Sequence, residues 1–266
     1  MSIQPPATSI PRSRVSRCIG SVLAATMLLA APPLYAQGTA AEAPVRDAAV
    51  MKRLAEVGSY LRAQKHFAVK ADAVVDEVLL SGQKLQFTST VDYQVSSPDK
   101  LRASVRSDRK YRDYYFDGKT LTQVAPRNGY YASVPLPGTI GEAMTAVAQR
   151  YEVEIPLADL FLWGTPKGGL DDVTAALLVG PARIGGVDAD HFALRQPGVD
   201  WQVWVERGAR PLPLKVVITT TDDPAQPQYA ATLKWDLKAN PAASVFTYVP
   251  AKGAHRIELK PVAAAK

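Results

Sequence analysis

The sequence predicts a mainly β protein with helices, an α+β fold built around an unclosed antiparallel sheet of about eleven strands. Most of the chain alternates apolar and polar residues with a period of two, which is typical of strands that have one buried and one solvated face. Short turn signals such as Asp117-Gly118 and Asn128-Gly129 separate these runs. Stretches with helical spacing at the start and in the middle of the chain predict helices that cover the buried face.

The first residues have the order of a secretory signal peptide. Arg12, Arg14 and Arg17 precede an apolar stretch at 18–31, and Ala36 ends a plausible cleavage site. This stretch is shorter than the ~20 residues of a membrane-spanning helix, so cleavage is favoured over a retained anchor. We therefore expect export to the periplasm and cleavage near Ala36.

The predicted segments are a signal peptide and one domain between two flexible tails. The sequence contains no internal linker or low-complexity tract that would divide the domain. The terminal tails are rich in alanine, a composition common in mobile chain ends. The boundaries are 1–36 for the signal peptide, 37–44 for the first tail, 45–258 for the domain and 259–266 for the second tail.

Composition excludes several classes of function for the exported chain. Cys18 is the only cysteine and lies in the predicted signal peptide, so we expect neither a disulfide nor a thiolate metal site. The net charge is +6, and it falls to +3 once the three arginines of the signal peptide are removed. A mildly basic exported protein is a poor match to nucleic-acid binding. We expect no nucleic-acid partner, no metal and no cofactor.

Three segments have the apolar spacing of amphipathic helices. The first covers 45–64, the second begins at Ile140 and continues to Tyr151, and the third is a short helix at 157–163 that ends at Gly164. The apolar stripe of the first helix consists of Val50, Leu54, Val57 and Leu61.

The strands fall into two groups on either side of the central helices. Residues 66–134 predict a meander of about six strands joined by short turns. Further strands are expected at 173–178, 181–184, 189–195, 201–206, 212–218, 229–237 and 245–249. Each longer strand has one apolar parity, which must be buried against another layer.

We interpret the apolar parity as the wall of a hydrophobic cavity beneath a helical lid. Solid core is the commoner role of such residues and remains the alternative for each one. The expected cavity residues are Phe67, Val69, Leu85, Phe87, Val91, Tyr93, Leu101, Val105, Trp201, Val203, Leu214, Val216, Ile218, Leu233 and Trp235. The expected lid residues are Ile140, Met144, Val147, Leu160, Phe161 and Trp163.

Several short motifs follow one another in a characteristic order. They are Pro98–Arg102, Tyr115–Leu121, Ile184–Val187, Trp204–Glu206, Arg210–Lys215 and Phe246–Pro250. In this order the chain resembles the superfamily of the periplasmic lipoprotein carrier LolA and the receptor LolB, and most of all a branch of predicted periplasmic proteins of unassigned function.

The resemblance implies an unclosed β-barrel with a helical lid over a cavity that shelters acyl chains. The chain departs from the carrier pattern at Ser97, where the carriers have an arginine that bonds to the lid. Arg102 matches a basic residue of the wider superfamily, and Arg102 and Arg112 are the expected contacts for a lipid headgroup. The implied ligand is a lipid or an acylated lipoprotein, with an inner- or outer-membrane protein as a further partner.

No catalytic motif is visible, and we expect a protein without enzymatic activity. His191 lies near Asp188 and Asp190, but a strand points His191 to the opposite face from both carboxylates. His66 and His255 have no partners at a metal-binding or catalytic spacing. The leading hypothesis is a lipid or lipoprotein carrier. An envelope sensor or assembly factor that binds a protein segment, and an unrecognised hydrolase, are the alternatives.

Overall fold

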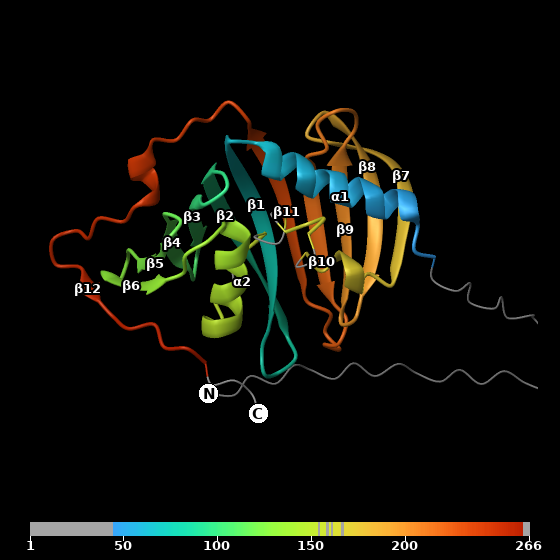
Figure 1. The fold of residues 1–266 in the computed structure, drawn as a ribbon. Coiled ribbons are helices and arrows are strands. Elements are labelled where there is room, and N and C mark those ends of the chain that lie inside the picture. Colours follow the sequence, from blue (N-terminus) through green and yellow to red (C-terminus); the bar gives the residue numbers. More distant parts are fainter. Residues whose placement is uncertain (1–44, 154, 158–159, 161, 166–167, 263–266) are drawn as a thin grey trace, which may run out of the picture. The chain divides into compact units, whose positions relative to one another are not determined.

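The computed structural model describes residues 45–153, 155–157, 160, 162–165 and 168–262. The predicted signal peptide, the tail at 37–44 and Phe161 lie outside these residues. Twelve strands form one sheet in the order β12-β6-β5-β4-β3-β2-β1-β11-β10-β9-β8-β7 (Figure 1). The strands are β1 (His66–Val78), β2 (Lys84–Ser96), β3 (Lys100–Ser107), β4 (Tyr111–Phe116), β5 (Thr120–Ala125), β6 (Tyr130–Pro135), β7 (Ala175–Ile184), β8 (Val187–Gln196), β9 (Val199–Glu206), β10 (Pro213–Thr220), β11 (Gln228–Asp236) and β12 (His255–Arg256).

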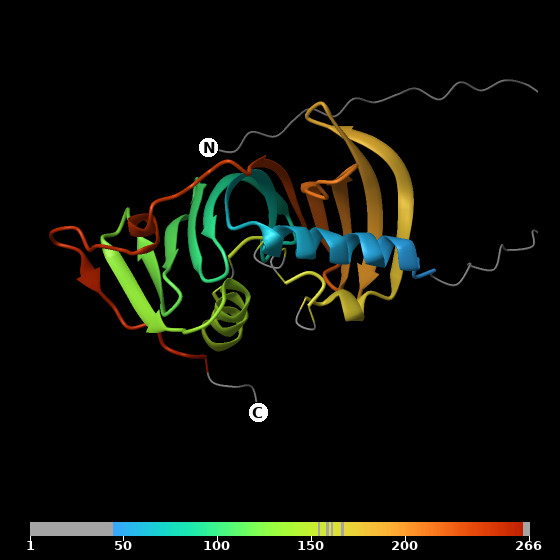
Figure 2. The same ribbon diagram turned by 45° about the horizontal axis from the view of Figure 1, so that its top comes forward.

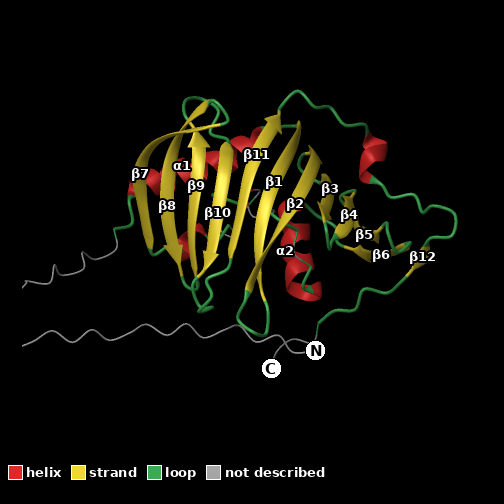
Figure 3. Cartoon of the chain, turned by 180° about the vertical axis from the view of Figure 1, so that it is seen from behind, coloured by secondary structure: helices red, strands yellow, loops and turns green. Residues whose placement is uncertain are grey.

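The sheet consists of two antiparallel meanders that meet at its centre. The chain runs outward from β1 to β6, passes to the far edge at β7, and returns strand by strand to β11 (Figure 3). There β11 pairs with β1, so that Val69 stands opposite Trp235 on one side and Tyr93 on the other. The edge strands β7 and β12 do not pair with each other, so the sheet is unclosed, as predicted. Only the two-residue strand β12 runs parallel to its neighbour among the described strands.

Two α-helices lie on the same face of the sheet, which we call the inner face. Helix α1 (Ala48–Ala63) crosses the half formed by β7 to β11, and α2 (Ile140–Tyr151) lies over the half that begins at β2 (Figure 2). Asp47 caps α1 through its Oδ1, which accepts a hydrogen bond from the backbone N–H of Ala49. Thr139 and Glu142 form a reciprocal capping box at the start of α2. These local signals fix where both helices begin.

The core lies between the helices and the inner face. The apolar stripe of α1 is buried as a whole, and the alternate residues of β1, β2, β3 and β9 are buried beneath the helices. The predicted helices at 45–64 and 140–151 and the six-strand meander are confirmed. The fully buried core members include Leu54, Val57, Phe67, Val91, Val95, Leu101, Phe116, Val203 and Val205.

The opposite face, which we call the outer face, is partly covered by the C-terminal segment. After β11 the chain forms a 3-10 helix, η3 (Ala243–Phe246), which contacts β3 and β4. Phe246 is buried, and the ring of Tyr248 lies 5.4 Å from that of Tyr115 and 5.2 Å from that of Tyr131. The last strand predicted at 245–249 was therefore wrong, because Phe246 is buried by a helical turn rather than by a ladder.

Two further predictions differ from the structure or are only partly described. The strands expected at 173–178 and 181–184 are one strand, β7, with a register shift between Leu178 and Gly180. Of the short helix predicted at 157–163, residues 158, 159 and 161 lie outside the described part of the chain, while Leu157 and Trp163 lie in turns. A 3-10 helix, η2 (Leu170–Asp172), follows before β7.

Candidate functional site

A connecting segment between α2 and β7 covers one end of the inner face. We call the described residues of this connection, 155–157, 160, 162–165 and 168–172, the roof segment. It lies over the ends of β9 and β10, where α1 does not reach, and contributes Leu157, Leu160 and Trp163 to the space between it and the sheet. Unlike α1, the described part of the roof segment consists of turns and short 3-10 segments and has no continuous apolar stripe.

A cavity of about 370 Å³ lies beneath the roof segment. Its floor is the inner face of β9 and β10, and the indole rings of Trp163 and Trp201 meet in it with centroids 5.3 Å apart. The lining is mainly apolar and consists of Leu157, Leu160, Trp163, Gly168, Gly169, Leu170, Gln196, Val199, Trp201, Val216 and Ile218.

Side chains from the surrounding elements hold the roof segment through its backbone carbonyls. From β8, Gln196 Nε2 donates to the carbonyl of Gly169 at 2.7 Å. Arg46, just before α1, donates to the carbonyl of Leu170 at 3.1 Å. Two more contacts of this kind run from Tyr93 Oη to Pro156 and from Arg62 to Trp163. A segment without its own hydrogen-bond ladder is thereby fixed by donors on rigid elements.

An arginine of α1 also contacts the roof segment. Arg62 donates to the carbonyl of Trp163, and it lines a second hollow of about 340 Å³ together with Ser97 and Pro98.

Helix α1 approaches the roof segment closely at Gly58. A Cβ atom at this position would lie 1.8 Å from the carbonyl oxygen of Trp163, which is far inside van der Waals contact. Gly58 is buried on the α1 face that also carries Val57 and Leu61. The absence of a side chain thus allows the carbonyl of Trp163 to reach the guanidinium of Arg62.

The structure separates the predicted cavity residues into two groups. Trp201, Val216 and Ile218 form the floor of the cavity, and Leu160 and Trp163 of the predicted lid form its roof. The others border no part of this cavity. Phe67, Val69, Val91, Tyr93, Leu101, Val105, Val203, Leu214 and Leu233 are buried, and Leu85, Phe87 and Trp235 are partly buried. The lid residues Ile140, Met144 and Val147 are buried in the same core on α2, and Phe161 is not described.

Several cavity residues were not predicted from the sequence. Val199 and Gln196 flank the turn at Gly198 and were assigned no role, although Val199 continues the inner parity of Trp201 and Val203. That parity is a signal that could have identified Val199. Leu170 stands alone among small and acidic residues, so no periodic pattern pointed to it.

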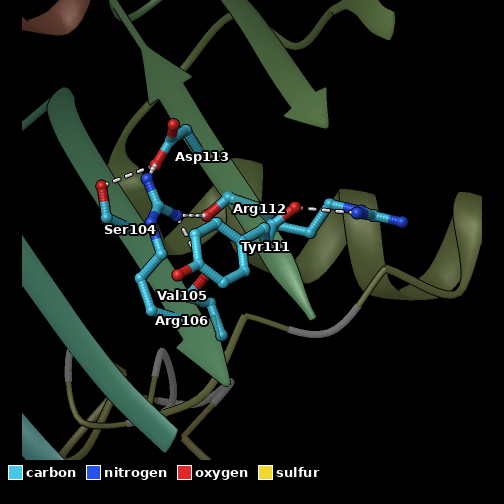
Figure 4. Close-up of polar contacts among 6 residues, drawn as sticks. All are labelled: Ser104, Val105, Arg106, Tyr111, Arg112 and Asp113. Atoms are coloured by element: carbon cyan, nitrogen blue, oxygen red, sulfur yellow. Dashed lines mark hydrogen bonds and ion pairs between the residues drawn. The ribbon is translucent and has the colours of Figure 1, made fainter. Parts of the chain in front are cut away.

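The two predicted headgroup arginines lie on opposite faces of the sheet. Arg102 stands on the outer face with its guanidinium 5.3 Å from the ring of Tyr115. Arg112 stands opposite Val105 of the inner parity, and its Nη1 donates to the carbonyl of Tyr111 at 2.8 Å (Figure 4). Neither borders the cavity beneath the roof segment. Their role as headgroup contacts stays a prediction.

The strongest polar cluster of this region lies on the outer face. Arg106 forms an ion pair with the buried carboxylate of Asp113 at 2.5 Å, and Ser104 donates to the same oxygen at 2.7 Å (Figure 4). Arg106 and Arg127 both lie against the ring of Tyr111. An open hollow of about 420 Å³ beside them has mixed polar and apolar walls, which include Asp72, Arg106 and Asp108.

The described residues show no arrangement for metal chemistry. No group of three or more His, Cys, Asp or Glu side chains is close enough to hold an ion in the described part of the chain. His191 stacks on Trp204 with centroids 4.0 Å apart, and its Nε2 bonds to Gln202 Oε1 at 2.9 Å. None of the helices that the structure describes has the length and apolar character needed to cross a membrane.

The chain is similar to several solved structures. Lipoprotein LppX of Mycobacterium tuberculosis is 14% identical over 73% of this chain and 98% of its own, with a TM-score of 0.45. LprF of Mycobacterium bovis is 15% identical over 76% and 99%, with a TM-score of 0.43. A LolA superfamily protein of Nitrosomonas europaea is 11% identical over 75% and 97%, with a TM-score of 0.36. None of the curated proteins matches this chain.

A family model gives the clearest assignment. The model described as predicted periplasmic protein (DUF2092) matches residues 50–260, which include most of α1, the whole sheet and the roof segment. This match confirms the predicted membership in a branch of periplasmic proteins without an assigned function. The chain belongs to the DUF2092 family of predicted periplasmic proteins.

Proposed function

We propose that this protein is a non-catalytic periplasmic carrier that binds lipid or lipoprotein acyl chains in the cavity beneath the roof segment. The cavity carries the proposal, because it is an apolar space of about 370 Å³ between a roof of turns and the floor of β9 and β10. Binding pockets for small molecules span about 300–1,000 Å³, so this cavity is at the small end of that range. Each methylene group that leaves water contributes about 0.8 kcal/mol, so a single acyl chain can bind firmly in a small space.

The proposal includes export to the periplasm, with the signal peptide removed near Ala36. The arginines followed by an apolar stretch support export, and the family is described as periplasmic. The cargo would be a free lipid or the acyl chains of a lipoprotein, handed to or from a membrane protein. A carrier needs no catalytic group, which agrees with the apolar lining of the cavity.

The test is whether the protein purified gently from the cell envelope carries a lipid. Native mass spectrometry and organic extraction should identify an acyl-chain ligand bound to the wild-type protein. Ile218→Trp places a large ring in the cavity and should abolish this binding, because Ile218 lines the floor. Val217→Trp is the matched control on the same strand, since Val217 pairs with Gln202 and Ala230 on the outer face.

The outcome that contradicts the proposal is a wild-type protein without lipid. If gentle preparations contain no ligand, and delipidated protein takes up none from added lipid, the cavity does not serve as a carrier site. Equal lipid content in Ile218→Trp and Val217→Trp would instead place the lipid elsewhere on the protein.

A protein partner is the second candidate function, and the edge strand β7 favours it. Leu177, Leu178 and Val179 are three consecutive apolar residues there, each about half exposed. Exposed apolar edges of sheets commonly mark interaction sites. Crosslinking in the envelope would detect the partner, and Leu178→Lys should remove the crosslink without changing the lipid content.

A further inference from the structure

Two polar groups on the inner face next to the cavity lack hydrogen-bond partners. The indole Nε1 of Trp201 and the hydroxyl of Tyr229 are buried, and neither has a partner among the described residues. Trp201 is only 7% exposed. Buried polar groups without partners are rare in folded proteins, because leaving one unpaired costs free energy. Each such group therefore calls for an explanation.

Elsewhere on the inner face, a tryptophan and a tyrosine do have hydrogen-bond acceptors. Trp235 on the same face donates its Nε1–H to the carbonyl of Pro213 at 2.7 Å. Tyr93, also on this face, donates its hydroxyl to the carbonyl of Pro156. The fold thus satisfies an indole and a phenol in the filled part of the inner face. Trp201 and Tyr229 lie beside the hollow part, and their donors stay unpaired among the described residues. The other buried polar atoms without a partner in the described part of the chain are His66 Nδ1, Arg102 Nε and Gln123 Oε1, and none of these residues lines the cavity.

The two unpaired donors belong to one row of side chains. Trp201 pairs across the sheet with Ile218, and Ile218 pairs with Tyr229, so the three residues lie side by side on β9, β10 and β11. Trp201 and Ile218 both line the cavity. Neighbouring strands are about 4.8 Å apart, so both donors are within reach of one ligand that extends along this row.

The charge of the site restricts the acceptor that these donors can meet. None of the described residues that line the cavity is ionisable, and the lining side chains with polar atoms are Trp163, Gln196 and Trp201. The arginines that contact the lining residues, Arg46 and Arg62, donate to the backbone carbonyls of Leu170 and Trp163. Burial raises the pKa of Tyr229 to about 12, so its hydroxyl keeps its proton and remains a donor. A carboxylate buried here would find no cation in the lining and would lose its hydration.

We propose, on the basis of the carrier function above, that the cavity selects lipids with a neutral carbonyl acceptor, which is an acyl ester or amide, over free fatty acids. The carbonyl oxygen lies between Trp201 Nε1 and Tyr229 Oη, which is two strands further along the row, and accepts hydrogen bonds from them. The acyl chain then fills the space between Leu157, Leu160 and Val216. The site therefore recognises the linkage of the chain as well as its hydrocarbon.

The test compares three ligands of equal chain length by displacement of the dye N-phenyl-1-naphthylamine from the protein as isolated. The ligands are methyl decanoate, ionised decanoate and decane. The double variant Trp201→Phe/Tyr229→Phe removes both donors, keeps the ring of Tyr229 and replaces the indole of Trp201 with a smaller phenyl ring. Because the smaller ring also reduces apolar contact, we expect the affinity for methyl decanoate to fall about three- to tenfold more than the affinity for decane. Ionised decanoate should bind the wild type at least about tenfold more weakly than the ester.

Trp204→Phe is the matched control, because Trp204 lies on β9 on the outer face and stacks on His191. It should leave all three affinities unchanged. An infrared measurement needs no variant: the carbonyl stretch of bound, isotope-labelled methyl decanoate should shift to lower frequency than in alkane solution. An unshifted carbonyl overturns the inference, as does an equal loss of ester and decane binding in the double variant.

The same data separate this inference from the carrier proposal. Binding of decane and the ester without discrimination by Trp201 and Tyr229 overturns the inference and leaves the carrier function standing. Failure of all three ligands to displace the dye from delipidated wild-type protein overturns both. Tighter binding of ionised decanoate than of the ester overturns the selection for neutral acceptors alone.

Discussion

The two ends of β9 face the same side of the sheet but have different surroundings. Val203 and Val205 lie near α1, where Arg53 donates to the carbonyl of Glu206, and both are fully buried in solid core. Val199 and Trp201, at the other end, border the cavity beneath the roof segment. The apolar alternation of the strand is the same at both ends. The layer above the strand therefore decides whether an apolar residue becomes core or cavity wall.

The largest expected change in stability comes from a leucine-to-alanine substitution in the solid core, and the matched substitution beside the cavity should cost less. Leu54→Ala on α1 removes a fully buried side chain from close-packed core, and should lower the free energy of unfolding by about 3–5 kcal/mol. Leu160→Ala enlarges a space that is already hollow, so it should cost less than about 2 kcal/mol. Urea unfolding of both variants measures the difference. Equal losses would mean that the cavity is as tightly filled as the core, which would undo the comparison.

An intermediate loss of stability is expected where α1 contacts the roof segment, at Gly58. Gly58→Ala inserts a methyl group against the carbonyl oxygen of Trp163, and the backbone has to move away. Overpacking of this kind costs about 1–3 kcal/mol, and it should also displace the roof segment and weaken lipid binding. Thermal melting and dye binding measure the two effects.

Gly141→Ala is the control for Gly58→Ala. Its new Cβ would meet only the end of the Leu162 side chain, at 2.5 Å, and that side chain can rotate. We expect stability and dye binding close to those of the wild type. If Gly141→Ala were the more damaging of the two, the close approach of α1 to the roof segment would not control the cavity.

The smallest change in stability is expected on the outer face, away from both the solid core and the cavity. Arg195 holds Asp200 through two hydrogen bonds of 2.6 Å, and this bonding lowers the pKa of the Asp200 carboxyl group. A lowered pKa in the folded state contributes stability above the pKa of the unfolded chain. That contribution is lost as the pH falls through the folded pKa. Asp200→Asn should therefore be slightly less stable than the wild type at neutral pH and equally stable in strong acid.

The control for this ion pair is Asp188→Asn. Arg183 and Asp188 are both about two-thirds exposed and share a single contact of 3.2 Å, so solvent screens them strongly. This variant should show no measurable pH-dependent difference in urea unfolding. A loss of stability in Asp200→Asn that persisted in strong acid would show that the residue acts through packing instead of charge.

Much of the fold could be predicted because the local signals agree with the tertiary structure. The alternation in Leu85–Val95 places the inner parity of β2 correctly, and the spacing of Val50, Leu54, Val57 and Leu61 gives the buried face of α1. The capping box at Thr139 marks the start of α2. Such patterns reflect one buried face per element, which is what both sheet and helix require.

The site was harder to predict, because core and cavity share one sequence pattern. The parity that places Trp201 in the cavity also places Val203 in solid core two residues later. The difference depends on the roof segment, where Gly164 and Gly168 allow turns that no periodic pattern describes. The role of Gly58 could not be predicted for the same reason. Position 58 requires a glycine because the carbonyl of Trp163, far away in the sequence, lies against it.

The pairing of β1 with β11 has a consequence for how the chain acquires its structure. Strand β1 comes early in the chain, and its partner β11 comes near the end. The hydrogen-bond ladder that places Val69 opposite Trp235 can therefore form only after most of the chain has been made. Contacts between residues so distant in sequence form slowly, because the intervening chain must first be ordered. After the first meander (β1 to β6) has been synthesised, the edge of β1 that pairs with β11 therefore stays unpaired until the second meander (β7 to β11) has been made.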